Sequence, residues 1–571
     1  MPPSVKDVHR YHDGTKHQFD RFARSTGYLD WASQPAPFRS FEGSRVIPLP
    51  QAPAAIDQSF DGPDVSYDAL FSRSVAAAPL GAGSVGNLLR HSLGLSAWKQ
   101  AGASRWSLRV NPSSGNLHPT EAYVVCGPMG GLSDAAGVYH YAPDRHALEE
   151  RCALEAGRWI AATSQCRDVV LVALTSIHWR EAWKYGERAF RYCQHDAGHA
   201  IGALAFAAAA LGWDTRLLPS WSHAAIAALT GADRDEDFVE AEREEPACVL
   251  AVRPARGRSS SGEDADSTGE RDNLRGIESA ELVAAVRGGR WSGRASQLSA
   301  HHVQWTFIDE VAEATRTPGA GQAGEAGWPG QAGGEAHVSS VPALPAPPVP
   351  PALPARQLFL QRRSAVAFDR RTHLSYDGFL RMLDRVLPRA GAPWDVLSWE
   401  PRVHLLLFVH RVETLAPGLY LLSRSVEGGD RLYAAIGRDF SHDRVHDSIP
   451  LVRLASGDCR QLARRLSCDQ DIAADGCFTV AMLAEFDRAL DSEGGAAYRQ
   501  LFWETGVIGQ VLYLEAEAAG IRGTGIGCFY DDQVHDALGI TGHAFQSLYH
   551  FTVGTPVEDR RLSTEPGYSW G

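Results

Sequence analysis

The strongest constraint on this fold is an internal repeat. Three features recur at a constant offset of 308 residues: an Ala-aromatic-Arg motif, a glycine, and a second glycine closing an apolar run. They are Ala189–Tyr192, Gly198 and Gly212, and then Ala497–Gln500, Gly506 and Gly520. Each run is expected to be a helix that closes on a glycine, the residue that best tolerates the left-handed cap. Gly137–Tyr141 likewise corresponds to Gly418–Leu422, and Ser72–Ser74 to Arg362–Ser364. We predict a duplication over about 60–255 and 355–562.

Each half combines short apolar strands with long amphipathic or apolar helices. The clearest strands are expected at Val169–Leu174, Cys248–Val252, Val403–Val409 and Phe478–Leu483. This pattern favours an α+β fold with a central sheet wrapped by helices.

Two stretches of biased composition divide the chain. Pro254–Asp272 is polar and Ser/Gly-rich, and Pro318–Pro354 turns from Gly/Ala-rich to Pro-rich, which predicts an extended, semi-rigid linker. Helical spacing within about 277–314 indicates a helical connector. We therefore predict an arm with little regular structure at 1–60, a first domain at 61–255, a linker with its connector at 256–354 and a second domain at 355–571.

Composition narrows the class of protein. With 44% hydrophobic and 22% charged residues, the chain is expected to be globular and soluble, and a net charge of −13 argues against an extended nucleic-acid surface. No apolar run is long enough to span a bilayer, and the amino terminus lacks an apolar signal core. The nine scattered cysteines predict reduced thiols in a cytoplasmic protein, without a zinc or disulfide framework. We therefore expect the protein to act on a small molecule or a peptide.

The stretch Asn111–Thr120 leads into an apolar segment, Glu121–Cys126. Its Pro112-Ser113-Ser114-Gly-Asn116 turn offers hydroxyls, an amide and free backbone N–H groups where the chain must bend. Such a turn suits the edge of a flat polar ring, which needs several fixed hydrogen bonds.

Cations and glycines are concentrated in the second half. Arg362, Arg363 and Ser364 suit a phosphate monoester, which guanidinium binds bidentately; a solvated basic turn is the alternative. In Arg522–Phe529, Gly525 and Gly527 would let backbone N–H groups approach an anion or a ring, although the G-x-G-x-G spacing is not a dinucleotide fingerprint and an ordinary turn stays open. Arg560 and Arg561 add two cations, for which surface salt bridging is the alternative.

Lys184 and Tyr185 precede the first long helix. A desolvated lysine beside a hydroxyl can act as a general base, whereas a surface lysine beside a core tyrosine is the structural alternative. His118 is interpreted as a structural hydrogen-bonding residue. His9, His12 and His17 lack the spacing of a metal site, so we expect no metal.

Together these motifs resemble the nitroreductase-like FMN oxidoreductases, most closely the SagB/ThcOx-type dehydrogenases, which oxidise azolines in ribosomally made peptides. The resemblance implies two tandem domains, each a mixed or antiparallel sheet wrapped by helices, that form a pseudo-dimer with FMN between them. By this resemblance Lys184 and Tyr185 match the pair that removes a proton. The implied FMN-binding positions are Pro112, Ser113, Ser114, Asn116, Arg362, Arg363, Ser364, Gly525, Ile526, Gly527, Arg560 and Arg561.

Each half lacks the flavin-binding motifs of the family that the other half retains. Pro393–Trp399 replaces the Pro-Ser-Ser turn in the second half, while Ser72 and Gly212–Arg216 replace the phosphate arginine and the glycine loop in the first. We infer one competent FMN site and one degenerate site. Val366 stands where nitroreductases often carry a cation near the flavin, which disfavours simple nitroreductase activity.

Three functions follow from these features. The first is a SagB/ThcOx-type dehydrogenase in which Lys184 takes a proton, hydride passes to flavin N5, and oxygen or another acceptor re-oxidises the flavin. The second is an NAD(P)H-dependent nitro or quinone reductase, which needs no Lys-Tyr pair. The third is a non-catalytic flavin- or peptide-binding partner. The substrate, and any oligomerisation beyond the pseudo-dimer, stay open.

Overall fold

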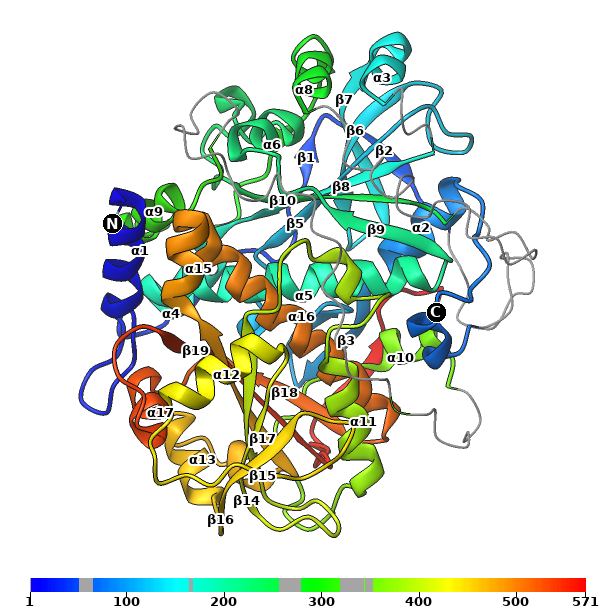
Figure 1. Cartoon of the computed structure of the whole chain (residues 1–571). Coiled ribbons are helices and arrows are strands. Elements are labelled where there is room, and N and C mark those ends of the chain that lie inside the picture. The colour runs from blue at the N-terminus through cyan, green and yellow to red at the C-terminus, as the bar shows by residue number, and fades with distance from the viewer. Residues whose placement is uncertain are drawn as a thin grey trace.

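Two large antiparallel sheets, one from each half of the chain, enclose a central pair of long helices (Figure 1). The computed structural model describes residues 2–50, 65–163, 168–255, 279–318, 344 and 353–570. Most of the two predicted linkers, Pro254–Asp272 and Pro318–Pro354, lies outside the described residues.

The two sheets have the same strand order, which confirms the duplication. The first runs β11-β7-β6-β5-β8-β10-β9, with β2 also on β7, and the second runs β15-β16-β14-β13-β17-β19-β18. The first-sheet strands are β2 (Arg45–Pro48), β5 (Thr120–Cys126), β6 (Ala136–Ala142), β7 (Ala147–Leu154), β8 (Val170–Ser176), β9 (Trp213–Leu217), β10 (Glu245–Pro254) and β11 (Arg290–Trp291). The second-sheet strands are β13 (Val403–Val409), β14 (Gly418–Leu422), β15 (Asp443–Arg444), β16 (Leu451–Ser456), β17 (Phe478–Glu485), β18 (Arg522–Ile526) and β19 (Phe545–Gly554). All four predicted strands are present, as β8, β10, β13 and β17.

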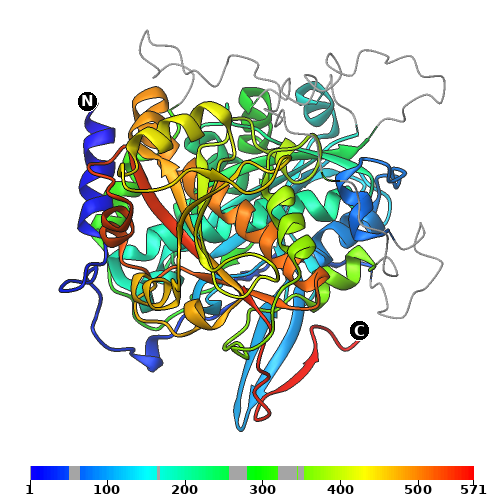
Figure 2. The same cartoon turned by 60° about the horizontal axis from the view of Figure 1, so that its bottom comes forward.

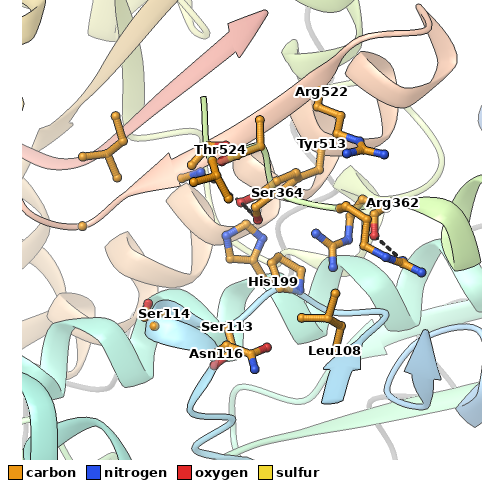
Figure 3. Close-up of a pocket in the computed structure, with 18 of the residues that line it drawn as sticks. Leu108, Ser113, Ser114, Asn116, His199, Arg362, Ser364, Tyr513, Arg522 and Thr524 are labelled. Atoms are coloured by element: carbon orange, nitrogen blue, oxygen red, sulfur yellow. Dashed lines mark hydrogen bonds between the residues drawn. The ribbon is translucent and has the colours of Figure 1, made fainter. Parts of the chain in front are cut away.

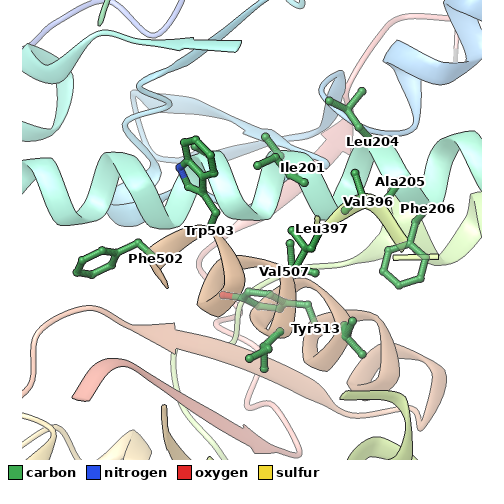
Figure 4. Close-up of a cluster of buried hydrophobic side chains, with 14 of the residues drawn as sticks. Ile201, Leu204, Ala205, Phe206, Val396, Leu397, Phe502, Trp503, Val507 and Tyr513 are labelled. Atoms are coloured by element: carbon green, nitrogen blue, oxygen red, sulfur yellow. The ribbon is translucent and has the colours of Figure 1, made fainter. Parts of the chain in front are cut away.

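The repeated helices α5 (Ala189–Ala209) and α16 (Ala497–Ala518) cross at equivalent glycines. A Cβ atom on Gly198 would lie 2.5 Å from the Trp503 carbonyl oxygen, and one on Gly506 would lie 2.7 Å from the Gly198 Cα. Any side chain here would force the helices apart. Apolar residues beyond the crossing, including Ile201 on α5 and Val507 on α16, extend one buried cluster through both halves (Figure 4).

Shorter helices surround the sheets and the central helix pair. They are α2 (Ala82–Arg90), α3 (Ala156–Ala162), α4 (His178–Tyr185), α6 (His223–Thr230), α8 (Ser279–Arg287), α9 (Thr306–Ala314), α10 (Ala355–Gln361), α11 (Tyr376–Val386), α12 (Val426–Ala435), α13 (Arg460–Leu466), α14 (Ile472–Asp475), α15 (Phe486–Glu493) and α17 (Asp531–Leu538). Helices α2 and α4 pack on α5, and α11 and α15 pack on α16. The predicted connector contains α8 and α9, with β11 and β12 (Arg294–Ala295) between them.

The amino-terminal arm is more regular than its sequence suggested. Its first residues form a helix, α1 (Pro3–Gly14), and β1 (Phe41–Glu42) pairs with β12. Val5, Val8 and Tyr11 share one face of α1 and are buried, and the Tyr11 ring lies 5.0 Å from the Phe307 ring of α9. The short helix therefore gains its stability from packing, which its polar composition does not reveal.

The carboxyl-terminal end of the chain returns to the first half. Strand β20 (Ser563–Pro566) pairs with β3 (Leu95–Ala101), which forms a hairpin with β4 (Ser104–Arg109). Figure 2 shows this hairpin projecting from the body with the carboxyl-terminal strand beside it. Among the helices that the structure describes, none combines the length and apolar character needed to cross a bilayer.

Candidate active site

A cavity of about 440 Å³ lies between the halves and is lined by both. Residues that follow β4 form one wall, and residues that follow α10 or belong to β18 form the opposite wall (Figure 3). This volume is within the range of sites that hold cofactors and small ligands. The cavity gathers the predicted turn, the arginine-serine motif and the glycine loop, although they are distant in sequence.

The Pro-Ser-Ser turn has a tight backbone held by its own side chains. Gly115 has φ of 58°, in the left-handed region that favours glycine. The Ser114 amide and hydroxyl both donate to the Asp196 carboxylate, each at 3.0 Å. The Asn116 side chain donates to the Ser107 carbonyl, and the Ser113 hydroxyl accepts from the His118 amide. Pro112, Ser113, Ser114 and Asn116 line the cavity, with part of their hydrogen bonding used to fix the turn.

Asp196 is a cavity residue that the sequence reasoning missed. It projects from α5 beneath the turn and is 1% exposed. Burial raises the pKa of its carboxyl to about 7, although the donors on Ser113 and Ser114 act in the opposite direction. Asp196 is therefore able to exchange a proton near neutral pH. The available signal was that Asp196 is the one carboxylate of this long helix.

The predicted phosphate grip forms the bridge between the halves. Arg362 donates to two backbone carbonyls at the end of β4, those of Val110 at 2.9 Å and Arg109 at 3.0 Å. Arg363 donates to the Ser96 carbonyl at 3.1 Å. The Ser364 hydroxyl lies 2.9 Å from the Tyr513 hydroxyl. The motif thus lines the cavity and also joins it to the first half, so the two arginines are not freely solvated cations.

Burial affects the electrostatics of these arginines. It lowers the pKa of Arg362, and burial followed by the neighbouring Arg362 charge lowers the pKa of Arg363 to about 10. Both guanidinia remain charged at neutral pH. Lys99 and Arg522 also line the cavity. Together the four side chains give this wall a positive character that suits an anion, although Arg522 also pairs with Glu558, which lines the same cavity.

The glycine loop lies on the cavity, and tyrosine packing explains its composition. A Cβ atom on Gly525 would lie 1.9 Å from the Tyr549 hydroxyl, and one on Gly527 would lie 2.1 Å from the Tyr192 ring. The Tyr192 hydroxyl donates to the Gly527 carbonyl at 3.2 Å. Gly525, Ile526 and Gly527 line the cavity together with both tyrosines, which the sequence reasoning also missed.

Lys184 and Tyr185 lie beside the Pro-Ser-Ser turn. A Cβ atom on Gly115 would lie 2.6 Å from the Tyr185 hydroxyl and 3.2 Å from the Lys184 amino group, so the glycine permits this close approach. The Lys184 amino group is 5.2 Å from the Tyr185 ring centroid. Tyr185 lines the cavity, and burial raises its pKa. Lys184 is exposed at the rim, so it is not the desolvated lysine that the sequence suggested.

The two terminal cations lie outside the cavity. Arg561 has an 88% exposed side chain and pairs with Asp559 at 2.7 Å, and Arg560 is also exposed. In this segment it is Glu558, Asp559 and Leu562 that line the cavity. For Arg561 the arrangement corresponds to the salt-bridge alternative.

The equivalent position on the other side of the pseudo-dimer has nearly closed. A cavity of about 40 Å³ remains there, lined by residues that include Arg73, Gly212 and Asp395. The Asp395 carboxylate pairs with Arg73 and lies 3.5 Å from the Arg216 guanidinium. The arginines of the first repeat are thus paired with a carboxylate of the protein itself, and the remaining space is too small for a cofactor.

Comparisons with known proteins agree with the fold. The model of the Nitroreductase family matches residues 99–252 and 418–555, together about half of the chain. A crystal structure of "a putative nitroreductase" from Anabaena variabilis superposes with a TM-score of 0.65 at 20% identity, covering 96% of this chain and 99% of that one. The curated "Putative nitroreductase MJ1384" of Methanocaldococcus jannaschii is 29% identical over 109 residues, which are 18% of this chain and 54% of that protein. The chain thus spans about half the length of that curated relative. Two matches to one family model, in halves with the same strand order, show that the chain belongs to the nitroreductase family as a tandem duplication of its fold.

Proposed function

We propose that this chain is an FMN-dependent oxidoreductase of the SagB/ThcOx dehydrogenase type, with one FMN in the cavity between its halves. A phosphate ester joined to a flat polar ring fits the residues present. One wall of the cavity is cationic and contains Lys99, Arg362, Arg363 and Arg522, together with the Ser364 hydroxyl. The Pro-Ser-Ser turn, Tyr192 and Tyr549 line the rest of the same cavity. Bound FMN would supply hydride acceptance at its N5 atom.

The observation that carries the proposal is the position of Lys184 and Tyr185 against the turn. Both side chains approach Gly115 so closely that a methyl group there would collide with the Tyr185 hydroxyl at 2.6 Å. In this proposal Lys184, at the cavity rim, takes a proton from a carbon atom of a substrate beside the ring. Oxidation of an azoline removes such a proton together with a hydride.

Acidic groups around the pair support proton transfer. Glu181, one turn before Lys184 on α4, is fully buried, and burial followed by the nearby Asp196 charge raises its pKa well above the usual value. Asp196, with a pKa of about 7, is a second buried carboxyl near the turn. Because Lys184 is exposed, it can release its proton to solvent and be ready for another turnover.

A peptide azoline is the substrate class that we propose. Lys184 at an exposed rim is accessible to a large substrate, whereas a base enclosed in the cavity would admit only small ones. Val366 lines the cavity and is 83% exposed, so it offers an apolar contact where a reductase of nitro compounds would use a cation.

Anaerobic single-turnover kinetics test the proposal. The purified full-length chain is mixed with an azoline-containing peptide or with NADPH, and bleaching of the flavin absorbance is recorded. The azoline should bleach the flavin, and Lys184→Ala should slow this step by about 100- to 10,000-fold without loss of flavin, as removal of a general base does. Lys6→Ala, which removes an exposed lysine of α1, is the matched control.

Two results would favour other functions. Rapid bleaching by NADPH alone, unaffected by Lys184→Ala, would identify an NAD(P)H-dependent reductase of nitro compounds or quinones. A bound flavin that no donor reduces would identify a binding partner without catalysis.

A further inference from the structure

Two cysteines and a histidine from three distant segments meet beside the cavity. His17 follows α1, Cys468 follows α13, and Cys528 follows β18. Their ligand atoms all lie within 4.8 Å of one another. The His17 Nδ1 atom is 3.5 Å from the Cys528 sulfur and 4.0 Å from the Cys468 sulfur. The expectation of no metal site rested on spacing along the chain, which cannot reveal such a group.

The structure assigns this cluster as a Cys₂His site for a transition metal ion, with Zn²⁺ as the ion that fits best. Zinc bonds of about 2.3 Å to sulfur and about 2.0–2.1 Å to nitrogen place neighbouring ligands of a tetrahedron about 3.6 Å apart. The two nitrogen–sulfur distances lie close to this separation. Thiolate and imidazole ligands in a tetrahedral arrangement favour zinc among the common divalent ions.

Hydrogen bonds already hold the three segments together. The His17 amide donates to the Asp531 carboxylate at 2.9 Å, and the Asp531 amide donates to the His17 carbonyl at 3.0 Å. The Gln470 side chain donates to the Ser467 and Cys528 carbonyls, both at 2.9 Å. The ligands are thus positioned before a metal ion arrives, which lowers the entropy cost of binding.

The surrounding charges suit a metal-bound cluster. Arg188 and Arg191 both pair with Asp531, at 2.9 Å and 2.6 Å, so the charges next to the cysteines are largely balanced by ion pairs. Two thiolates and Zn²⁺ add no net charge to this environment. A disulfide between the cysteines would also be neutral, but it would give no role to the imidazole nitrogen that lies near both sulfur atoms.

The site would fasten the amino-terminal segment to the cavity wall. Cys528 and Gln470 both line the cavity, and Cys528 directly follows the glycine loop. His17 is 8% exposed, whereas both cysteines are partly exposed, so an ion can enter from outside. With three protein ligands, a fourth position is left for water or an external ligand.

Metal titration tests the inference, whether or not a flavin binds. Full-length protein is treated with a chelator and a reductant, and then titrated with Zn²⁺ against a chromophoric indicator, or with Co²⁺. One ion should bind per chain, and Co²⁺ should give tetrahedral d–d bands at wavelengths beyond the flavin absorption. Cys468→Ser, Cys528→Ser and His17→Gln should each weaken Zn²⁺ binding by about 100-fold or more, because ligand loss should exceed the 10- to 100-fold effect of outer partners. Cys477→Ser and His301→Gln should not.

Thiol labelling of the wild-type protein is a second test, and it does not depend on whether a variant folds. Iodoacetamide should label Cys468 and Cys528 in chelated protein, and Zn²⁺ should suppress the labelling of both, as mapped by mass spectrometry. Binding that is unchanged in all three ligand variants would overturn the assignment. A disulfide between the two cysteines in protein purified without air, or labelling unaffected by Zn²⁺, would do the same.

Discussion

Asp196 gives the sharpest quantitative prediction. Its carboxyl is fully buried, and its pKa is about 7 against an ordinary value of 3.8. The folded state therefore binds a proton that the unfolded state releases between these two values, so the contribution of the carboxyl to stability is intact below about pH 4 and is lost as pH rises to about 7. The difference between these two pKa values, at 1.36 kcal/mol per pKa unit, amounts to about 4 kcal/mol.

Asp196→Asn removes the titration and keeps an acceptor for Ser114. Urea unfolding of the flavin-free wild type and variant, at matched pH, should show the variant gaining relative stability as pH rises from about 4 to about 8, by up to about 4 kcal/mol. Other titrating groups are present in both proteins, although Glu181 loses the influence of the Asp196 charge in the variant. At low pH both side chains are neutral, which supplies an internal control. A difference that stays flat, or that falls with rising pH, would show that the Ser114 donors keep Asp196 ionised and would refute the reasoning.

Two other substitutions test the cavity and the helix crossing. Arg362→Ala should weaken FMN binding by about 1.5–3 kcal/mol, the range for hydrogen bonds to charged groups, in equilibrium dialysis; Arg561→Ala, outside the cavity, should not, and equal effects would contradict the placement of the phosphate end. Gly198→Ala should destabilise the fold by about 1–3 kcal/mol through overpacking against the Trp503 carbonyl, as measured by denaturation. Gly130→Ala, where an added Cβ atom has open space, is its control, and similar losses in both would show that the crossing is not tight.

Sequence patterns predicted the parts of the fold that obey local rules. The constant offset between the two helices was visible because the glycines at their crossing admit no other residue. The glycines past their ends, Gly212 and Gly520, have φ of 66° and 72°, as the predicted caps require. The helix α1 was missed because tertiary packing of its buried face stabilises it, including the contact of Tyr11 with Phe307 about 300 residues away.

The site was predictable only where its residues form compact motifs. The turn at 112–116 and the arginine-serine motif carry recognisable strings, whereas Asp196, Tyr192 and Tyr549 resemble ordinary residues of a helix or a strand. Arg362 also shows what a string cannot convey. Its guanidinium serves the interface between the halves, through the Val110 and Arg109 carbonyls, as well as the cavity.

The central claim is that one competent site serves two halves, and flavin stoichiometry tests it most directly. The purified full-length chain is saturated with FMN, freed of excess, and denatured, and the released flavin is quantified by its visible absorbance per chain. The account predicts one FMN per chain, because the second position is reduced to about 40 Å³ and its cations pair with Asp395. Two FMN per chain would contradict the degenerate site, and a colourless chain that takes up no FMN would contradict the proposed cofactor.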